Sequence, residues 1–311
     1  MKRRTLRKRI ELFGGRLAVT GLLRLSGWLN PKRIERLGRL LGDFIYVASR
    51  RYRRVALKNL AAAFPEWDSK KVRSIARDTF RHFSRGVLEF FYLLRLPSED
   101  LDKWIDVEGI EHLETALAKG RGVVCVTAHL GNWELFARKI VLQGYKINVI
   151  ARDSDDPTMT GVANEMRQNA GYRVLPRDGS ALPALRCLRR NELLGILPDQ
   201  NTYSGIFVDF FGRPAATAPG PAVLALKAGA PIICGFARRM EGGRFKAVLY
   251  PPIEVPLSGN EEADVHAITS ALTKKIEDEI RKDPAQWLWL HDRWKRTSEA
   301  PDQAPSLGTL K

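Results

Sequence analysis

The sequence lacks the short motifs of the commonest nucleotide-binding and hydrolase sites. It contains no G-x-x-x-x-G-K-[ST] or G-x-G-x-x-G loop and no G-x-S-x-G turn, so neither a phosphate cradle nor a serine nucleophile is indicated. Its 5 histidines show no zinc-ligand spacing, and we expect neither a metal ion nor a resident cofactor. The chemistry is therefore expected to rest on ordinary side chains acting on bound substrates.

Cysteine is scarce as well. Cys125, Cys187 and Cys234 are odd in number, follow no C-x-x-C spacing and lie in apolar surroundings. Such a set indicates buried, reduced thiols rather than a disulfide framework, a metal site or a redox centre. We therefore expect the folded chain to face the cytosol or to lie within it.

Long apolar runs are also missing. The longest stretch without a charged residue is thirteen residues, Pro214 to Leu226, whereas a membrane-spanning helix needs about 20 mostly apolar residues. The N-terminal stretch MKRRTLRKRIELFGGRLAVTGLLRLSGWLN begins like a signal peptide, but Glu11, Arg16 and Arg24 interrupt it and no A-x-A cleavage site follows. Neither a cleaved signal nor a clean membrane span is predicted.

The N-terminal stretch does have the pattern of a helix lying in a membrane interface. One helical face can collect its large apolar side chains, with cations at the boundary to meet anionic headgroups; these side chains are Leu17, Leu22, Leu25 and Trp28. The alternative is a helix that packs on the main domain. Residues 1–60 are accordingly predicted to form a basic, helical, membrane-associating segment.

A second basic cluster, SRRYRRVALKNLAAAFPEW, occupies residues 49–67. It is either a solvated helix face or a site for phosphate-rich lipid or an acidic carrier protein, formed by Arg50, Arg51, Arg53 and Arg54.

The positive charge is confined to this N-terminal part. The formal net charge is +16, and residues 1–58 hold 17 Lys or Arg against three acids, whereas the rest of the chain holds 34 against 32. A nucleic-acid-binding domain would spread basic residues and stacking aromatics over its own face. We therefore expect no nucleic-acid partner, and we expect the basic segment to meet a membrane surface.

Residues 61–298 are predicted to form an α/β domain, followed by a flexible tail at 299–311. Apolar residues recur at three- and four-residue intervals from 68 to 96, which predicts a core helix, and another helix is expected at 260–282. Short β-branched runs alternate with helical stretches and lie at 122–128, 146–152, 173–176, 193–198, 231–237 and 244–250. This alternation predicts a central, mostly parallel sheet flanked by helices, with ligands at the carboxyl ends of its strands.

The stretch CVTAHLGNWELF marks one of these strand ends. His129 ends the buried-strand pattern GVVCVTAH, and a helical pattern begins after Gly131. Asn132 suits a helix N-cap, and a purely structural cap is one interpretation of the cluster. The other is a general-base site, in which His129 accepts a proton while Glu134 hydrogen-bonds the second ring nitrogen. The helix start would also stabilise a developing oxyanion.

HLGNWE resembles the H-x4-[DE] box of the lysophospholipid acyltransferase superfamily. Its H-x-G-N-W-E form is similar to that of the bacterial lipid A biosynthesis (lauroyl/myristoyl) acyltransferases. Four further stretches follow the same family's order, so that the resemblance covers nearly the whole chain: ARDSDDP (151–157), LGILPDQN (194–201), FVDFFGRPAATAPGPAVLALKAGAPIICGFARR (207–239) and QWLWLHDRWKR (286–296).

The resemblance implies a glycerolipid acyltransferase-like fold and a defined reaction. A fatty acyl group would pass from acyl carrier protein, or from coenzyme A, to a hydroxyl of a lipid A precursor at the cytoplasmic face of a bacterial inner membrane. His129 would deprotonate that hydroxyl, which would attack the thioester directly, and Glu134 would orient His129. Acyl carrier protein, an anionic lipid acceptor and the membrane surface are thus the expected partners, and all of them would be attracted by the basic segment.

Substrate binding is assigned to polar and glycine residues of the box and the downstream stretches: Asn132, Arg152, Asp199, Gln200, Gly212 and Arg213. Arg152 would bind phosphate or phosphopantetheine, and Asp199 would position Arg152 or the acceptor. A strand-end salt bridge and a turn residue are the respective structural alternatives.

Two aromatic stretches also have more than one interpretation. FVDFFGRP (207–214) either lines the acyl channel and binds headgroup phosphate or packs in the core. Three tryptophans close a core, which we favour, or reach a membrane interface; they are Trp287, Trp289 and Trp294.

The chain departs from the lipid A enzymes at positions near the end of these stretches. Gln200 and Asn201 stand where many of those enzymes carry an acidic residue or a histidine, and Asp292 stands where a basic residue is frequent. A lysophospholipid, an aminolipid or a phosphatidylinositol mannoside is therefore kept as an alternative acceptor. A thioesterase, in which His129 activates water, is the alternative reaction, although it would need neither an acceptor pocket nor a basic segment.

Overall fold

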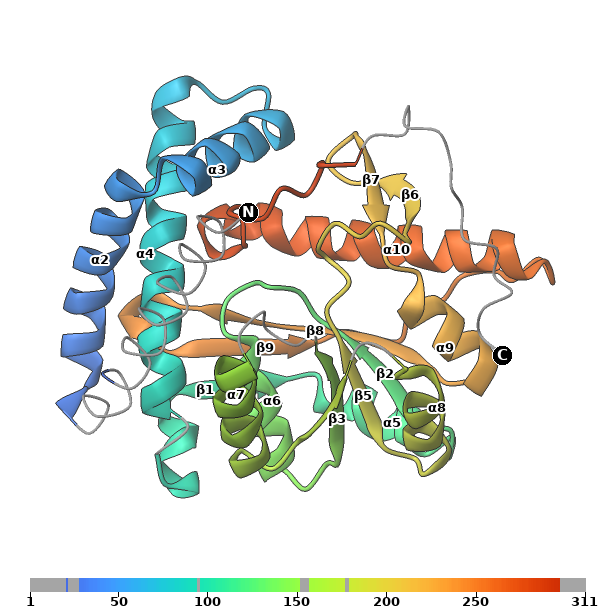
Figure 1. The fold of residues 1–311 in the computed structure, drawn as a ribbon. Coiled ribbons are helices and arrows are strands. Elements are labelled where there is room, and N and C mark those ends of the chain that lie inside the picture. The colour runs from blue at the N-terminus through green and yellow to red at the C-terminus, as the bar shows by residue number, and fades with distance from the viewer. Residues whose placement is uncertain (1–20, 22–27, 94–95, 152–156, 177–178, 297–311) are drawn as a thin grey trace, which may run out of the picture.

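The computed structural model describes residues 21, 28–93, 96–151, 157–176 and 179–296. Figure 1 shows a central sheet with helices on both of its faces and with α2 and α4 standing side by side at one end. The predicted apolar face of Leu17, Leu22 and Leu25 lies outside the described residues, as does the tail at 299–311.

The central sheet has seven strands in the order β1-β9-β8-β2-β5-β3-β4. All neighbouring pairs are parallel except β8 and β9, so the predicted mostly parallel sheet is confirmed. Six strands lie at the runs predicted from the sequence, and β1 is the addition. The bounds are β1 Ile105–Glu108, β2 Val123–Val126, β3 Ile147–Ala151, β4 Arg173–Pro176, β5 Leu193–Ile196, β8 Ile232–Arg239 and β9 Phe245–Leu249.

The direction of β9 follows from the short connection before it. Only residues 240–244 separate it from β8, too few for the crossover that a parallel neighbour requires. A separate antiparallel hairpin of β6 (Ile206–Asp209) and β7 (Pro214–Thr217) was not predicted either.

Helices cover both faces of the sheet. One face is packed by α8 (Ala181–Arg189), α9 (Gly220–Ala228) and α10 (Glu261–Lys282), and the other by α5 (Ile110–Leu117) and α6 (Trp133–Leu142). Next to the edge strand β4 lies α7 (Pro157–Asn169). The core interpretation of the tryptophans is confirmed, because they are at most 6% exposed and join the larger core cluster: Trp287, Trp289 and Trp294.

The three cysteines are unpaired, as predicted. Cys187 and Cys234 are buried and Cys125 is partly buried. Burial raises the pKa of each thiol to about 12.

The N-terminal helices are α2 (Pro31–Ala48), α3 (Arg50–Ala63) and α4 (Ser69–Leu93), of which α4 is the predicted core helix. Glycines bring α2 very close to α4. A Cβ atom on Gly38 would lie 2.2 Å from Arg85 Cγ, and one on Gly42 would lie 2.4 Å from Arg81 Cα. The two helices therefore meet largely backbone to backbone, and few side chains of α2 are buried.

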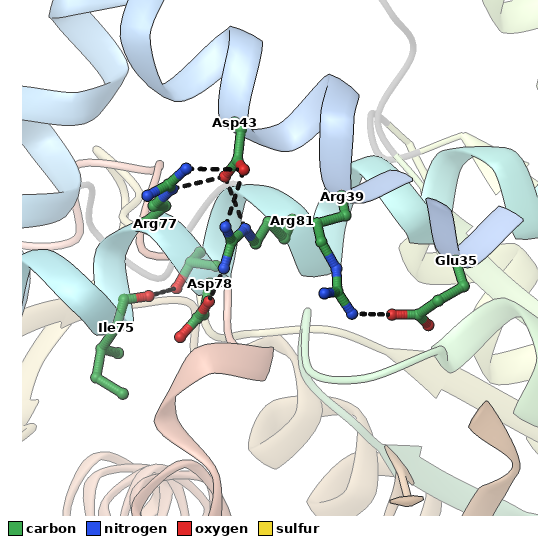
Figure 2. Close-up of polar contacts among 8 residues, drawn as sticks. Glu35, Arg39, Asp43, Ile75, Arg77, Asp78 and Arg81 are labelled. Atoms are coloured by element: carbon green, nitrogen blue, oxygen red, sulfur yellow. Dashed lines mark hydrogen bonds and ion pairs between the residues drawn. The ribbon is translucent and has the colours of Figure 1, made fainter. Parts of the chain in front are cut away.

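Ion pairs fix α2 to α4 along one flank (Figure 2). Both oxygens of Asp43 on α2 accept hydrogen bonds of 2.7–2.8 Å from the guanidinium groups of Arg77 and Arg81 on α4. These bonds hold the pKa of the Asp43 carboxyl far below its usual range. Glu35 on α2 also pairs with Arg85. Among the helices that the structure describes, none combines the length and the apolar character that crossing a membrane requires.

Candidate active site

The candidate site lies where two neighbouring parallel strands end. His129 comes three residues after β2, and Asp199 comes three residues after β5. Because β2 and β5 pair in parallel, their carboxyl ends meet at the same edge of the sheet. This adjacency brings together two side chains that are 70 residues apart in sequence.

Asp199 holds His129 through two contacts. Its Oδ1 lies 2.8 Å from His129 Nδ1, and its Oδ2 accepts the backbone N–H of His129 at 2.8 Å. Trp287 Nε1 also donates to Oδ2 at 2.8 Å. The Asp199 side chain is fully buried, and burial alone would raise its pKa. The charge of His129 and these hydrogen bonds outweigh burial and lower the pKa of Asp199.

The ionised Asp199 carboxylate fixes the tautomer of His129. Since a carboxylate only accepts hydrogen bonds, Nδ1 carries the proton and Nε2 is left with its lone pair. The Gln200 amide nitrogen is 3.4 Å from Nε2 and can donate to it. The indole of Trp133 packs edge-on against the imidazole, with 5.0 Å between ring centroids. The imidazole is thus oriented as a proton acceptor.

Glu134 is engaged elsewhere. Its Oε1 accepts from Arg167 Nη2 at 2.6 Å, and its Oε2 accepts from the hydroxyl of Tyr172. Burial and the nearby Glu134 charge raise the pKa of Tyr172, so its hydroxyl stays a donor. The hydrogen bond that we expected between Glu134 and His129 is made by Asp199 instead, because the first turn of α6 directs Glu134 towards α7 and β4.

The loop between His129 and α6 is tightly held. Asn132 Oδ1 accepts the Leu135 N–H at 2.9 Å, so the predicted N-cap is confirmed. Gly131 has a φ of +62°, and a Cβ atom there would lie 1.7 Å from the carbonyl oxygen of Ala237. Only glycine fits such a position without moving the strand.

A cavity of about 1110 Å³ opens beside His129. This exceeds the range of about 300–1,000 Å³ typical of small-molecule sites, and its apolar lining suits a lipid chain. Glu134, Arg167, Tyr172 and Gln200 also line it. The apolar part comes from both sides of the sheet and includes Phe136, Ile140, Val149, Ile196, Leu224 and Val265.

Several polar groups in the cavity wall were not predicted as site residues. Thr127 and Asn201 line the cavity, and their buried Oγ1 and Oδ1 atoms have no hydrogen-bond partner among the described residues. His291 Nε2 accepts the Asn201 N–H at 3.0 Å, and burial lowers the pKa of His291. Asn201 and His291 belong to stretches that carried the family resemblance, whereas no motif marked Arg167 or Tyr172.

The remaining predicted site residues are placed as follows. Arg152 lies outside the described residues. Gly212 and Arg213 form the turn of the β6–β7 hairpin, where the Gly212 N–H donates to Asp209 Oδ1 at 3.0 Å and the Arg213 guanidinium lies 5.8 Å from the centre of the Trp294 ring. Phe207 lines the cavity, whereas Phe210 and Phe211 pack in the core. The structure therefore brings Asp199 and Gln200, but not Gly212 or Arg213, into contact with His129.

Comparison with known proteins gives a consistent result. The sequence profile of the family described as bacterial lipid A biosynthesis acyltransferase matches residues 3–296. A phosphatidylinositol mannoside acyltransferase of Mycolicibacterium smegmatis is 28% identical over 304 residues, covering 93% of this chain and 95% of that protein. A lipid A biosynthesis lauroyltransferase of Escherichia coli K12 is 28% identical over 284 residues, covering 90% of each chain. A phosphatidylinositol mannoside acyltransferase of Mycobacterium tuberculosis H37Rv is 30% identical over 222 residues, covering 68% of this chain and 67% of that protein.

Proposed function

The chain belongs to the bacterial lipid A biosynthesis acyltransferase family and is an acyltransferase, and from this premise we propose its reaction. It moves a fatty acyl chain from acyl carrier protein, or from coenzyme A, to a hydroxyl of a lipid A precursor. The observation that carries the proposal is the His129–Asp199 contact beside a large apolar cavity.

His129 acts as the general base. Its Nε2 accepts the proton of the acceptor hydroxyl while the hydroxyl oxygen attacks the thioester carbonyl. The tetrahedral intermediate then collapses, the C–S bond breaks, and the leaving thiolate takes the proton back from Nε2. Asp199 stabilises the transient imidazolium from the Nδ1 side, and free N–H groups at the start of α6 favour the oxyanion.

Glu134 is the second acid of the proposed site. The sequence predicts that it binds His129 directly, whereas its contacts support a role through Arg167 and Tyr172. The Glu134–Arg167 pair shapes the cavity wall next to His129 and holds a fixed charge pair where the polar ends of the substrates would meet. Arg152, Asn201 and Thr127 remain candidates for contacts with those polar ends.

The reaction is tested by supplying the purified protein with acyl carrier protein and coenzyme A thioesters of several chain lengths. Each donor is paired with an under-acylated lipid A precursor, a lysophospholipid or an aminolipid, and the lipid products are weighed by mass spectrometry. A lipid A precursor that gains one acyl mass supports the proposal. Free fatty acid formed equally fast without any acceptor would instead identify a thioesterase.

Phosphatidylinositol mannoside is the second candidate acceptor. The observation in its favour is that two relatives with that name match this chain over 93% and 68% of its length. Their identities to this chain, 28% and 30%, are similar to the 28% of the lauroyltransferase. Gln200 and Asn201, which depart from many lipid A enzymes, lie at the cavity. Including this lipid in the same mass-spectrometric comparison decides between the two acceptors.

The cationic face of α3 supports acyl carrier protein as the donor partner. Arg50, Arg54 and Lys58 are exposed and recur every four residues, so they form a row along one side of the helix. Lys58 lies 3.6 Å from Asp292, next to His291 in the cavity wall. An acidic helix of a carrier protein would match this row, and its docking there would be weakened by salt.

Helix α2 supports association with an anionic membrane at the cytoplasmic face of a bacterial inner membrane. Its glycines and acidic residues face α4 or its flank, and five of its large apolar side chains are exposed. Trp28 at its start is 56% exposed and lies under the Arg33 guanidinium, 3.9 Å from the ring centre. Exposed basic side chains border an apolar stripe, as in interfacial helices; the stripe is Leu37, Leu40, Leu41, Phe44 and Val47.

A further inference from the structure

A buried ion pair contacts the active-site loop, and neither of its residues lines the cavity. Glu89 on α4 and Arg239 at the end of β8 have side chains only 2% and 8% exposed. Two guanidinium nitrogens bind the two carboxylate oxygens, Nη1 to Oε1 and Nη2 to Oε2, the latter at 2.6 Å. The pair joins segments that are 150 residues apart.

The acidic side of this pair contacts the loop that follows His129. Glu89 Oε2 accepts a hydrogen bond of 3.4 Å from Asn132 Nδ2. Asn132 is the N-cap of α6, and its own N–H donates to the Ala237 carbonyl oxygen at 3.0 Å. Glu89 therefore orients the residue that starts the helix next to His129.

The backbone of Arg239, next to its paired side chain, reaches the same loop through Gln286. The Arg239 N–H donates to Gln286 Oε1 at 2.7 Å, and Gln286 Nε2 donates to the Arg239 carbonyl at 2.8 Å. The backbone carbonyl of Gln286 in turn accepts the Gly131 N–H at 3.1 Å. Two residues further on, the Leu288 N–H donates to the His129 carbonyl at 3.1 Å.

Helix α4 contributes one more contact to this loop. His82 Nε2 lies 3.2 Å from the Gly131 carbonyl oxygen. Burial, with the nearby Arg239 charge, lowers the pKa of His82 to about 3. The ring is therefore neutral and donates its Nε2–H to Gly131.

Stability alone gives no reason for this arrangement. Removing a carboxylate and a guanidinium from water has a large free-energy cost, and well-packed apolar side chains of similar volume are often as stable or more stable. The pair is also incompletely satisfied, because Arg239 Nε has no partner among the described residues. What the pair does provide is a fixed carboxylate for Asn132, next to the Gly131 that Gln286 and His82 hold.

We infer that Glu89 and Arg239 are positioning residues for the acyl transfer. Glu89 holds Asn132, and Arg239 fixes Glu89, so that the His129 ring meets Asp199 through Nδ1 and presents Nε2 to the acceptor. The inference rests on the proposed role of His129 as the base. Neither residue touches the substrate; both act through the loop.

The test separates positioning from stability by using a double substitution. Glu89→Gln and Arg239→Gln each leave one partner buried and unpaired, and each is expected to lower both thermal stability and kcat. The double variant Glu89→Leu with Arg239→Met replaces the pair by apolar side chains, and its melting temperature is expected to return to that of the wild type. Its kcat should nevertheless stay about 10- to 100-fold below wild type, with KM for the donor nearly unchanged, because the base is misplaced.

Arg244→Gln, which breaks the exposed pair with Asp106, is the matched control and should behave as wild type.

A second readout does not depend on catalysis. Nitrogen-15 NMR of histidine-labelled protein reports the proton on His129 Nδ1, and we expect its resonance to shift or broaden in the double variant. A double variant with wild-type kcat and an unchanged Nδ1 signal would overturn the positioning role. If instead wild type and His129→Ala both fail to transfer acyl groups while the NMR change is seen, the proposed function fails and the positioning of His129 stands.

Discussion

The loop at residues 129–134 and helix α2 both have polar and apolar residues interleaved. They differ in which of these residues the fold buries. In the loop, His129, Asn132 and Glu134 point inward or into the cavity, and each is matched by a specific partner. In α2 the close contact is made by glycines, and the large apolar side chains are left exposed. An amphipathic pattern thus tells which residues share a face, whereas the packing partner decides which face is covered.

The largest effect is expected from His129→Ala. Removing the proposed base should lower kcat by about 1,000-fold, within the range for general-base catalysis. The melting temperature should fall only modestly, because Asp199 keeps the backbone N–H of residue 129 and Trp287 Nε1 as donors. Single-turnover transfer from an acyl thioester to the preferred lipid measures the loss, and near wild-type transfer would remove His129 from the mechanism.

Asp199→Asn is expected to lower kcat by about 100-fold. The amide can donate to Nδ1 as well as accept from it, so the tautomer that leaves Nε2 free is no longer enforced. The comparison of kcat at several pH values with wild type checks this, with circular dichroism as the control for folding. Equal activities across the pH range would show that the Asp199 contact has no catalytic role.

Glu134→Gln is expected to lower kcat/KM by a smaller factor, about 10-fold. Glutamine keeps the shape and can still accept from Tyr172, but it loses the charge that pairs with Arg167. Steady-state kinetics should place most of this loss in KM for one substrate. If kcat fell as much as in Asp199→Asn, Glu134 would instead support His129 directly.

The sequence was informative about strands and caps, and less so about partners. The apolar runs located β2, β3, β4, β5, β8 and β9, and Asn132 was identified as a cap, because these features depend on local pattern. The pairing of His129 with Asp199 depends on β5 lying next to β2, which no local pattern specifies. Asp199 was identified only as a substrate-binding residue at a strand end.

Other misses have the same origin. Arg167 and Tyr172 meet Glu134 only because α7 and β4 fold back beside α6. The exposed stripe of α2 was not predicted, because the close approach of Gly38 and Gly42 to α4 leaves no hydrophobic signal in the sequence. Strand β1 has the sequence IDVE, in which apolar and acidic residues alternate, so it lacks the apolar run that marks the other strands of the sheet.

Substitutions on the exposed apolar face of α2 are expected to change membrane binding and to leave the active site unchanged. Leu40→Asp with Phe44→Asp should weaken binding to vesicles containing anionic phospholipid by about 10-fold or more, since each large apolar side chain contributes roughly 1.5–3 kcal/mol on burial. Leu182→Asp, at a leucine of similar exposure on α8, is the matched control. Co-sedimentation measures binding, and unchanged pelleting of the α2 variant would place the membrane contact elsewhere.

The smallest effect is expected from Asp43→Asn, which removes the ion pairs that fix α2 to α4. The free energy of unfolding should fall by about 1 kcal/mol or less, because the pairs are partly exposed. The pKa of Asp43 is lowered on folding, so its contribution is present above the unfolded pKa of about 3.9 and is lost as pH falls through the folded value. Urea unfolding at pH 7 and near pH 2 checks this, and a difference from wild type that grows in acid would contradict it.

The central claim is that His129, held by Asp199, activates the acceptor for direct attack on the thioester. The measurement that tests it most directly follows the mass of the intact protein and of the lipid after acyl carrier protein thioester is added, first without and then with the lipid acceptor. The account predicts an unmodified protein and little free fatty acid in the first step, then a lipid that is heavier by one acyl group. An acyl-protein adduct, or fatty acid released just as fast without the acceptor, would contradict it.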